Sequence, residues 1–143
     1  MINLSDYQQP AAIKAALQHK RIAVVGLSSN PARPSNDVTA YMLAQPQGYE
    51  IVPVNPRETT VFGLTSYPSL LAAREAVGDI AVVNVFRDSN AVPGIAAEAV
   101  AIGAQVLWLQ LGVVHADGIE LAAQAGMSVI ADKCLKIEHA RYL

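Results

Sequence analysis

Five short apolar segments constrain the fold of this chain more than any other feature of its sequence. Their apolar residues follow one another almost without interruption, whereas a strand with one face in water would alternate apolar with polar residues. Strands that are covered on both faces are typical of parallel sheets. The sequence therefore predicts a parallel sheet of about five strands, formed by Ile22–Val25, Ile51–Val54, Ile80–Val85, Val106–Leu109 and Val129–Ala131.

Segments with the spacing of amphipathic helices lie between these predicted strands. Three of them end at a glycine that can terminate a helix, namely Gly78, Gly103 and Gly126. Strand alternating with helix, joined by right-handed crossovers, predicts an α/β fold with a Rossmann-like doubly wound sheet. The predicted helices are Asn36–Leu43, Ser69–Val77, Pro93–Gly103 and Gly118–Ala125, with two flanking helices in Pro10–His19 and in the tail Lys133–Leu143.

The composition limits the classes of partner. With 143 residues, 52% of them hydrophobic, we expect one domain, 1–143, that needs no disulfide or metal for stability. The formal charge of −2 provides no basic face for DNA or RNA, so a small molecule or a protein is the expected partner. No apolar run approaches the ~20 residues that span a bilayer, and the polar N-terminus predicts no signal sequence. A single cysteine fits a cytoplasmic protein.

The first predicted strand runs into a polar loop rich in serine and proline. In an open α/β sheet this turn leaves backbone N–H groups unpaired, and the next helix adds the positive end of its dipole. We therefore predict a phosphate site of a nucleotide, where serine hydroxyls donate and Arg33 pairs with phosphate oxygens. A surface turn in which Ser35 caps the helix is the alternative, and both can hold at once. The predicted contacts are Gly26, Ser28, Ser29, Asn30, Arg33, Pro34 and Ser35.

Two features of the sequence disfavour NAD as the nucleotide. The first loop lacks the three glycines of the dinucleotide fingerprint. An NAD enzyme would also present an acidic side chain after the second strand to accept the ribose hydroxyls, whereas Asn55 and Arg57 stand here. This pair is compatible with a ribose that carries a 2′- or 3′-phosphate; a turn framed by prolines is the alternative. The predicted contacts are Pro53, Asn55, Pro56 and Arg57.

The ends of the third and fourth predicted strands add further candidates at the same edge of the sheet. Phe86 either faces a base or packs beneath the loop, and Arg87 pairs either with a ligand phosphate or with a nearby acid such as Asp88. Gln110 is a polar group on an otherwise apolar strand, and Gly112 permits close approach of a ligand. Trp108 is expected in the core.

No catalytic or metal-binding arrangement is predicted from the sequence. His19, His115 and His139 are far apart and without metal-ligand spacing, so we expect each at the surface or at a helix cap. Cys134 follows Lys133 beside the last predicted strand, where a small buried residue is the expected role.

Five motifs taken together resemble a known family. The chain is similar to the small, stand-alone CoA-binding proteins and to the CoA-binding domain of the succinyl-CoA synthetase α subunit. The resemblance extends over nearly the whole chain, and the motifs occur in the same order. They are Val24–Val38, Val52–Pro56, Val85–Ser89, Val106–Gly112 and Ala131–His139.

This resemblance implies a Rossmann-like domain that holds coenzyme A across the carboxyl ends of its strands. It implies that the loop from Gly26 to Ser35 lies against the diphosphate and that the turn after the second strand lies near the adenosine 3′-phosphate. It implies that Phe86–Ser89 and Leu109–Gly112 line the rest of the cleft. Ligase activity is not expected, because the sequence has no counterpart of the synthetase domain that carries a phosphorylated histidine.

Three functions follow as hypotheses. The first is non-catalytic binding of coenzyme A or an acyl-CoA, as a sensor or carrier. The second is a small NADP(H)-dependent oxidoreductase, which Asn55 and Arg57 allow, although no proton donor is evident. The third is a protein-interaction module that has lost its ligand.

Overall fold

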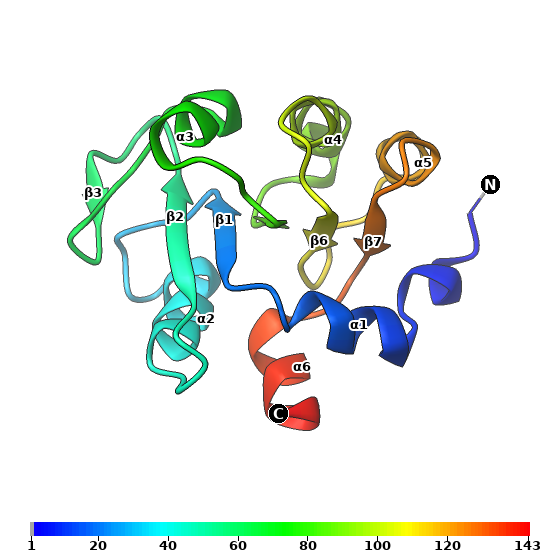
Figure 1. The fold of residues 1–143 in the computed structure, drawn as a ribbon, viewed down its shortest axis with the longest axis horizontal. Helices are drawn as coiled ribbons and strands as arrows, with labels where there is room; N and C mark the ends of the chain where they lie inside the picture. The colour runs from blue at the N-terminus through cyan, green and yellow to red at the C-terminus, as the bar shows by residue number, and fades with distance from the viewer. Residues whose placement is uncertain (1) are drawn as a thin grey trace.

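A computed structural model describes residues 2–143 and contains a five-stranded parallel sheet (Figure 1). The strand order is β2-β1-β5-β6-β7, so β1 and β5 lie inside the sheet and β2 and β7 form its edges. Pro53 occupies β2, and an edge strand tolerates proline because one side needs no ladder partner. The strands are β1 (Arg21–Val25), β2 (Glu50–Val54), β5 (Val82–Val85), β6 (Val106–Leu109) and β7 (Ser128–Ile130).

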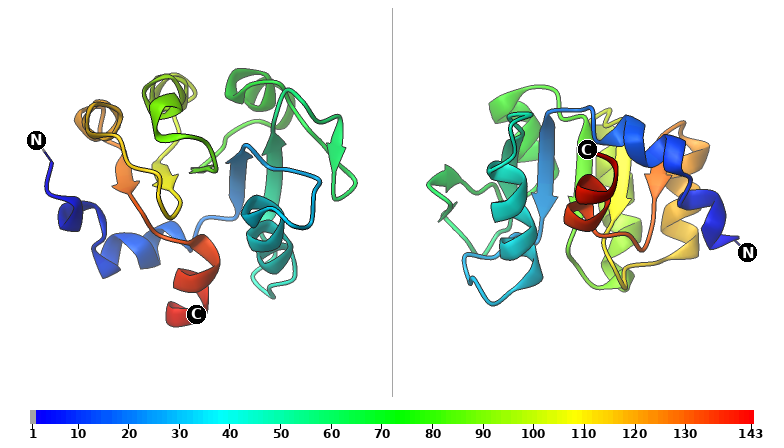
Figure 2. Two further views of the ribbon diagram at one scale, coloured as in Figure 1. Left: turned by 180° about the vertical axis from the view of Figure 1, so that it is seen from behind. Right: turned by 90° about the horizontal axis from the view of Figure 1, so that it is seen from below.

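Helices cover both faces of this sheet, as the near-continuous apolar runs predict. Helices α3 (Leu70–Val77), α4 (Val92–Ala101) and α5 (Ala116–Gln124) cover one face, while α1 (Pro10–Ala16), α2 (Pro34–Leu43) and α6 (Leu135–Tyr142) cover the other (Figure 1). The view from below in Figure 2 shows α1, α2 and α6 side by side across their face. The predicted α/β, Rossmann-like fold is confirmed.

Two buried clusters correspond to the two faces. Successive residues of a strand point to opposite sides, so Ala23 and Val25 join the cluster under α3, α4 and α5, whereas Ile22 and Val24 join the cluster under α1, α2 and α6. Trp108 is fully buried in the second cluster, as expected. Both buried clusters extend to the carboxyl ends of the strands, where the candidate site lies.

Several local features differ from the sequence predictions. Helix α5 begins at Ala116 instead of Gly118, and β5 begins at Val82 instead of Ile80. Helix α2 begins at Pro34, two residues earlier than expected, and Arg33 is its N-cap; Ser35 therefore lies inside the first turn and does not cap the helix. A small hairpin of β3 (Thr60–Val61) and β4 (Leu64–Thr65) was not predicted. Neither were the short 3-10 helices η1 (Leu4–Tyr7) and η2 (Ser89–Ala91).

The strand order creates a crevice at the carboxyl edge of the sheet. From β1 the chain crosses to β2 on one side and then returns to β5 on the other, so the loops after β1 and β5 diverge. Ligands of open α/β folds bind at such a switch point. Within residues 2–143, no helix has the length and apolar character that crossing a lipid bilayer requires.

Candidate functional site

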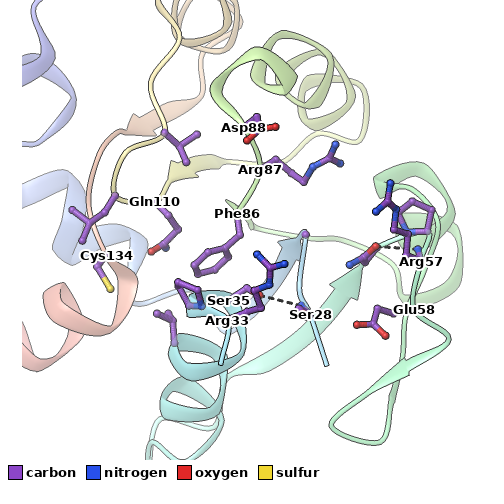
Figure 3. Close-up of a pocket in the computed structure, with 17 residues that line it drawn as sticks. Ser28, Arg33, Ser35, Arg57, Glu58, Phe86, Arg87, Asp88, Gln110 and Cys134 are labelled. Atoms are coloured by element: carbon purple, nitrogen blue, oxygen red, sulfur yellow. Dashed lines mark hydrogen bonds between the residues drawn. The ribbon is translucent and has the colours of Figure 1, made fainter. Parts of the chain in front are cut away.

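A cleft of about 1050 Å³ lies at this switch point (Figure 3). Segments that follow all five strands of the sheet contribute to its walls, together with the first turns of α2. Of the predicted contacts it brings together Gly26, Ser28, Arg33, Pro34, Ser35, Asn55, Pro56, Arg57, Phe86, Arg87 and Gln110. Its other lining residues are Val38, Glu58, Asp88, Leu111, Val113 and Cys134.

The first loop was expected to leave backbone N–H groups unpaired, but internal acceptors occupy four of them. Ser28 N donates to Ser35 Oγ at 3.0 Å, and Asn30 N donates to Ser28 Oγ at 3.0 Å. Ala32 N donates to Asn30 Oδ1, again at 3.0 Å, and Arg33 N donates to the Asn30 carbonyl. Serine and asparagine side chains form such local bonds readily. These internal hydrogen bonds hold the loop in its conformation.

A carboxylate outside the set of predicted contacts also holds this loop. Ser29 N donates to Glu58 Oε2 at 2.6 Å, and Ser29 Oγ donates to Glu58 Oε1 at 3.1 Å. Glu58 lies only four residues beyond β2, so the turn after β2 contains an acidic group as well as Asn55 and Arg57. The turn that was expected to present Asn55 and Arg57 to a phosphorylated ribose therefore also presents a carboxylate.

Gly26 is required by the protein backbone itself. Its φ of +87° is unfavourable for other residues, and a Cβ atom built there would lie 2.3 Å from the Phe86 carbonyl oxygen. Gly26 N donates to the Val54 carbonyl at 2.8 Å. The glycine thus joins the ends of β1, β2 and β5 at the base of the cleft.

Three arginines from three different strand-end segments line the cleft: Arg33, Arg57 and Arg87 (Figure 3). All three are exposed, and within residues 2–143 no carboxylate forms an ion pair with any of them. The acidic lining residues are Glu58, which bonds to Ser29, and Asp88. Guanidinium groups left without carboxylate partners in a cleft are available to bind phosphate.

Asn55 connects two of the loops. Its Nδ2 donates to the Leu27 carbonyl at 3.0 Å, and its Oδ1 accepts from Arg57 N at 3.0 Å. Both ends of its amide therefore bond to the protein, and the bond to Arg57 N fixes the backbone at Arg57.

The end of the cleft beside β6 and β7 is more apolar, because Leu111, Val113 and Cys134 follow these strands. Val38 and Phe86 also line the cleft, together with the almost fully buried Gln110. Gln110 Nε2 donates to Asn84 Oδ1 at 2.6 Å, and Gln110 Oε1 accepts from Leu135 N at 3.4 Å. The predicted contact Gln110 thus lines the cleft while bridging β5 and the start of α6.

Cys134 and Arg57 lie at opposite ends of the cleft in Figure 3. Cys134 is 8% exposed, so it is the small buried residue that was expected, yet it also belongs to the wall. Arg57 follows the edge strand β2, whereas Cys134 follows the other edge strand, β7. The cleft therefore extends across the full sheet, whose outer strands are about 19 Å apart at a spacing of about 4.8 Å.

Four predicted contacts lie outside the cleft lining. Ser29 and Asn30 are exposed in the first loop, where their polar groups serve the internal bonds described above. Pro53 pairs with Val24 within the sheet. Gly112 has a φ of +79°, and its N–H donates to Asp132 Oδ1 at 2.7 Å.

The expectation for the histidines is correct for His115 and wrong for His139. His115 is the N-cap of α5, and its Nδ1 accepts from Gly118 N at 3.2 Å. His139 is 3% exposed, between Tyr41 Oη at 2.8 Å from Nδ1 and Gln47 Oε1 at 3.1 Å from Nε2. Burial lowers the pKa of His139 below its usual value of 6.5.

Comparison with known proteins gives a consistent result. Residues 20–140 match the family model of the CoA binding domain. The chain is 44% identical over 131 residues to protein YneT of Bacillus subtilis (strain 168), covering 91% of this chain and 93% of YneT. A hypothetical protein from Pyrococcus horikoshii OT3 superposes with a TM-score of 0.88 at 31% identity, covering 99% of this chain and 96% of that one.

A larger enzyme contains the same fold. The dinucleotide forming acetyl-coenzyme A synthetase 1 of Ca. Korarchaeum cryptofilum superposes with a TM-score of 0.65 at 20% identity. The match covers 77% of this chain and 25% of the synthetase. This likeness concerns the fold.

Proposed function

Because this chain belongs to the family of CoA-binding domains, we propose that it binds coenzyme A or an acyl-CoA in the strand-end cleft, without catalysing a reaction. The observation that carries the proposal is the set of three arginines without carboxylate partners among the described residues, each from a different strand-end segment. Coenzyme A has phosphate groups at two places, a diphosphate and an adenosine 3′-phosphate. Several separated cations suit such a ligand better than they suit a single phosphate.

The shape of the cleft supports one orientation of the ligand. In our proposal the adenosine 3′-phosphate lies beside Arg57 and the diphosphate lies beside Arg33 and Arg87. The pantetheine arm then follows the apolar wall of Val38 and Val113 toward Cys134. An elongated molecule is needed to extend across a sheet about 19 Å wide.

A protein that holds coenzyme A without reacting suits a role as sensor or carrier, and we propose this role for the chain. The cytoplasm is the proposed compartment, on the ground that the only cysteine is free.

The 3′-phosphate contact provides the test of this proposal. Calorimetric titration should give tighter binding of coenzyme A than of dephospho-coenzyme A, by about tenfold, since an exposed charge-assisted contact is partly screened. In Arg57→Ala this difference should shrink toward none. Arg74→Ala is the matched control, because Arg74 lies on α3 outside the cleft lining and pairs with Asp79. Equal affinities for the two ligands in the unmodified protein contradict the placement of the 3′-phosphate, and no binding of either contradicts the function.

A further inference from the structure

Glu58 presents a negative charge to donors of the first loop. Its two carboxylate oxygens accept from Ser29 N and Ser29 Oγ, at 2.6 and 3.1 Å. A backbone N–H next to a hydroxyl, both directed at one anion, is the arrangement by which loops of this kind hold phosphate. In this structure the anion is a side chain of the protein.

The other donors of the loop differ from Ser29 in this respect. The backbone N–H groups of Ser28, Asn30 and Ala32 all donate to uncharged acceptors within the loop or the first turn of α2. Ser29 is therefore the residue of the loop that donates hydrogen bonds to a charged acceptor.

The position of Glu58 does not result from an ion pair with a cleft arginine. The cleft contains three guanidinium groups, but within residues 2–143 Glu58 forms an ion pair with none of them. Its carboxylate is partly buried in the wall that a ligand phosphate would approach. A phosphate that enters the cleft therefore meets a like charge at this wall.

We propose that Glu58 is a specificity-determining residue of the cleft wall: its bonds to Ser29 hold the carboxylate in place, and its charge lowers the affinity of the cleft for phosphate ligands. The inference rests on the proposed function for its physiological ligand, although its electrostatic basis applies to any phosphate that enters the cleft. The carboxylate repels simple anions from this wall of the cleft, and only a ligand with enough additional contacts overcomes the repulsion.

Neutralising Glu58 without changing its size tests the proposal. Glu58→Gln retains an acceptor for Ser29 N but removes the charge. Removing a like charge within a Debye length of a phosphate changes affinity by roughly three- to tenfold. Calorimetric titrations of Glu58→Gln should therefore give about three- to tenfold tighter binding of coenzyme A and of inorganic pyrophosphate. This gain should shrink at high salt, which a purely structural role would not produce.

Glu75→Gln is the matched control, because it makes the same change in net charge at an exposed position of α3. It should leave both affinities unchanged. Unchanged or weaker binding of both probes in Glu58→Gln overturns the inference and makes Glu58 a support of the loop. The pyrophosphate titration separates this result from a failure of the proposed function. If the unmodified protein binds no coenzyme A but Glu58→Gln tightens pyrophosphate binding, the proposed function fails while the repulsion by Glu58 stands.

Discussion

At Gly26 the backbones of two strand-end loops meet so closely that only a hydrogen atom fits between them. The neighbour is a carbonyl oxygen of Phe86, which cannot move away as a flexible side chain could. A side chain here would disturb the floor of the cleft and the ends of three strands together. The glycine is therefore a requirement of the fold before it is a requirement of any ligand.

Gly26→Ala should lower the free energy of unfolding by about 2–4 kcal/mol, because a left-handed backbone and a steric overlap act together. Denaturant titration measures this change. Gly103→Ala is the matched control: its φ is +74°, but nothing lies within 4 Å of a Cβ atom there, so a loss of about 1 kcal/mol is expected. Equal losses in the two variants would contradict the overlap with Phe86.

At the scale of elements, the contact between α2 and α6 contains a buried histidine. His139 on α6 bonds to Tyr41 on α2, and its other ring nitrogen faces Gln47 just beyond α2. The bonds fit a neutral ring in which Nε2 donates and Nδ1 accepts, a tautomer assigned from its partners. A proton added to Nδ1 would displace the bond from Tyr41.

This contact should make stability depend on pH. Burial lowers the pKa of His139 in the folded protein below 6.5, so between the two values the unfolded chain binds more protons. The contribution of His139 to the free energy of unfolding should therefore be at its maximum above about pH 6.5. It should fall as the pH decreases toward and through the lowered pKa of the folded state. Denaturant titrations from pH 8 to pH 5 measure the slope.

His139→Gln removes the titrating ring and should flatten the dependence on pH in this window, although it lowers stability at neutral pH. His19→Gln is the control, since it removes a histidine beyond the end of α1 without touching the contact between α2 and α6. A slope that persists unchanged in His139→Gln would assign the effect to other groups.

The elements could be predicted from the sequence because their signals are local. Segments such as Ile22–Val25 are apolar throughout because both faces of the strand are covered, and Gly78, Gly103 and Gly126 have the positive φ that ends a helix. The hairpin of β3 and β4 was not predicted, because strands of two residues are too short to show a hydrophobic pattern.

The contacts of the site were less predictable, because they join residues that are far apart in the chain. Most of the cleft residues follow from the rule that ligands bind at the carboxyl ends of strands. Nothing near Glu58 in the sequence indicates that it reaches Ser29, and nothing near His139 indicates a contact with Tyr41. The N–H groups of Ser28, Asn30 and Ala32 were expected to be unpaired, but each donates to a side chain of the loop or of the first turn of α2.

For the whole molecule, the important property is that one cleft extends from edge to edge of the sheet. A ligand that fills it should cover Cys134 at one end while it contacts Arg57 at the other. Saturating coenzyme A should therefore slow alkylation of this single cysteine by iodoacetamide by roughly tenfold or more. Adenosine 3′,5′-bisphosphate, which lacks the pantetheine arm, should protect it much less. Full alkylation in the presence of bound coenzyme A would show that the arm does not reach Cys134.

The same cleft should discriminate among nucleotides through global stability. A ligand that binds only the folded state adds about 2.7 kcal/mol at 100 times its dissociation constant. For a chain of 143 residues this raises the melting temperature by about 5–15 °C. Thermal scans with coenzyme A should give such a shift. NAD should give none, because Glu58, the acidic residue of the turn after β2, is bonded to Ser29 and the first loop lacks the required glycines.

NADP is the informative third ligand in these scans, because its 2′-phosphate could also pair with Arg57. Its nicotinamide would have to occupy the apolar end beside Val38 and Val113, which better suits a narrow, flexible arm. We therefore expect NADP to shift the melting temperature less than coenzyme A does. A larger shift with NADP, at equal concentration, would favour an oxidoreductase, and equal shifts with all three ligands would mean that the cleft recognises phosphate charge without selecting coenzyme A.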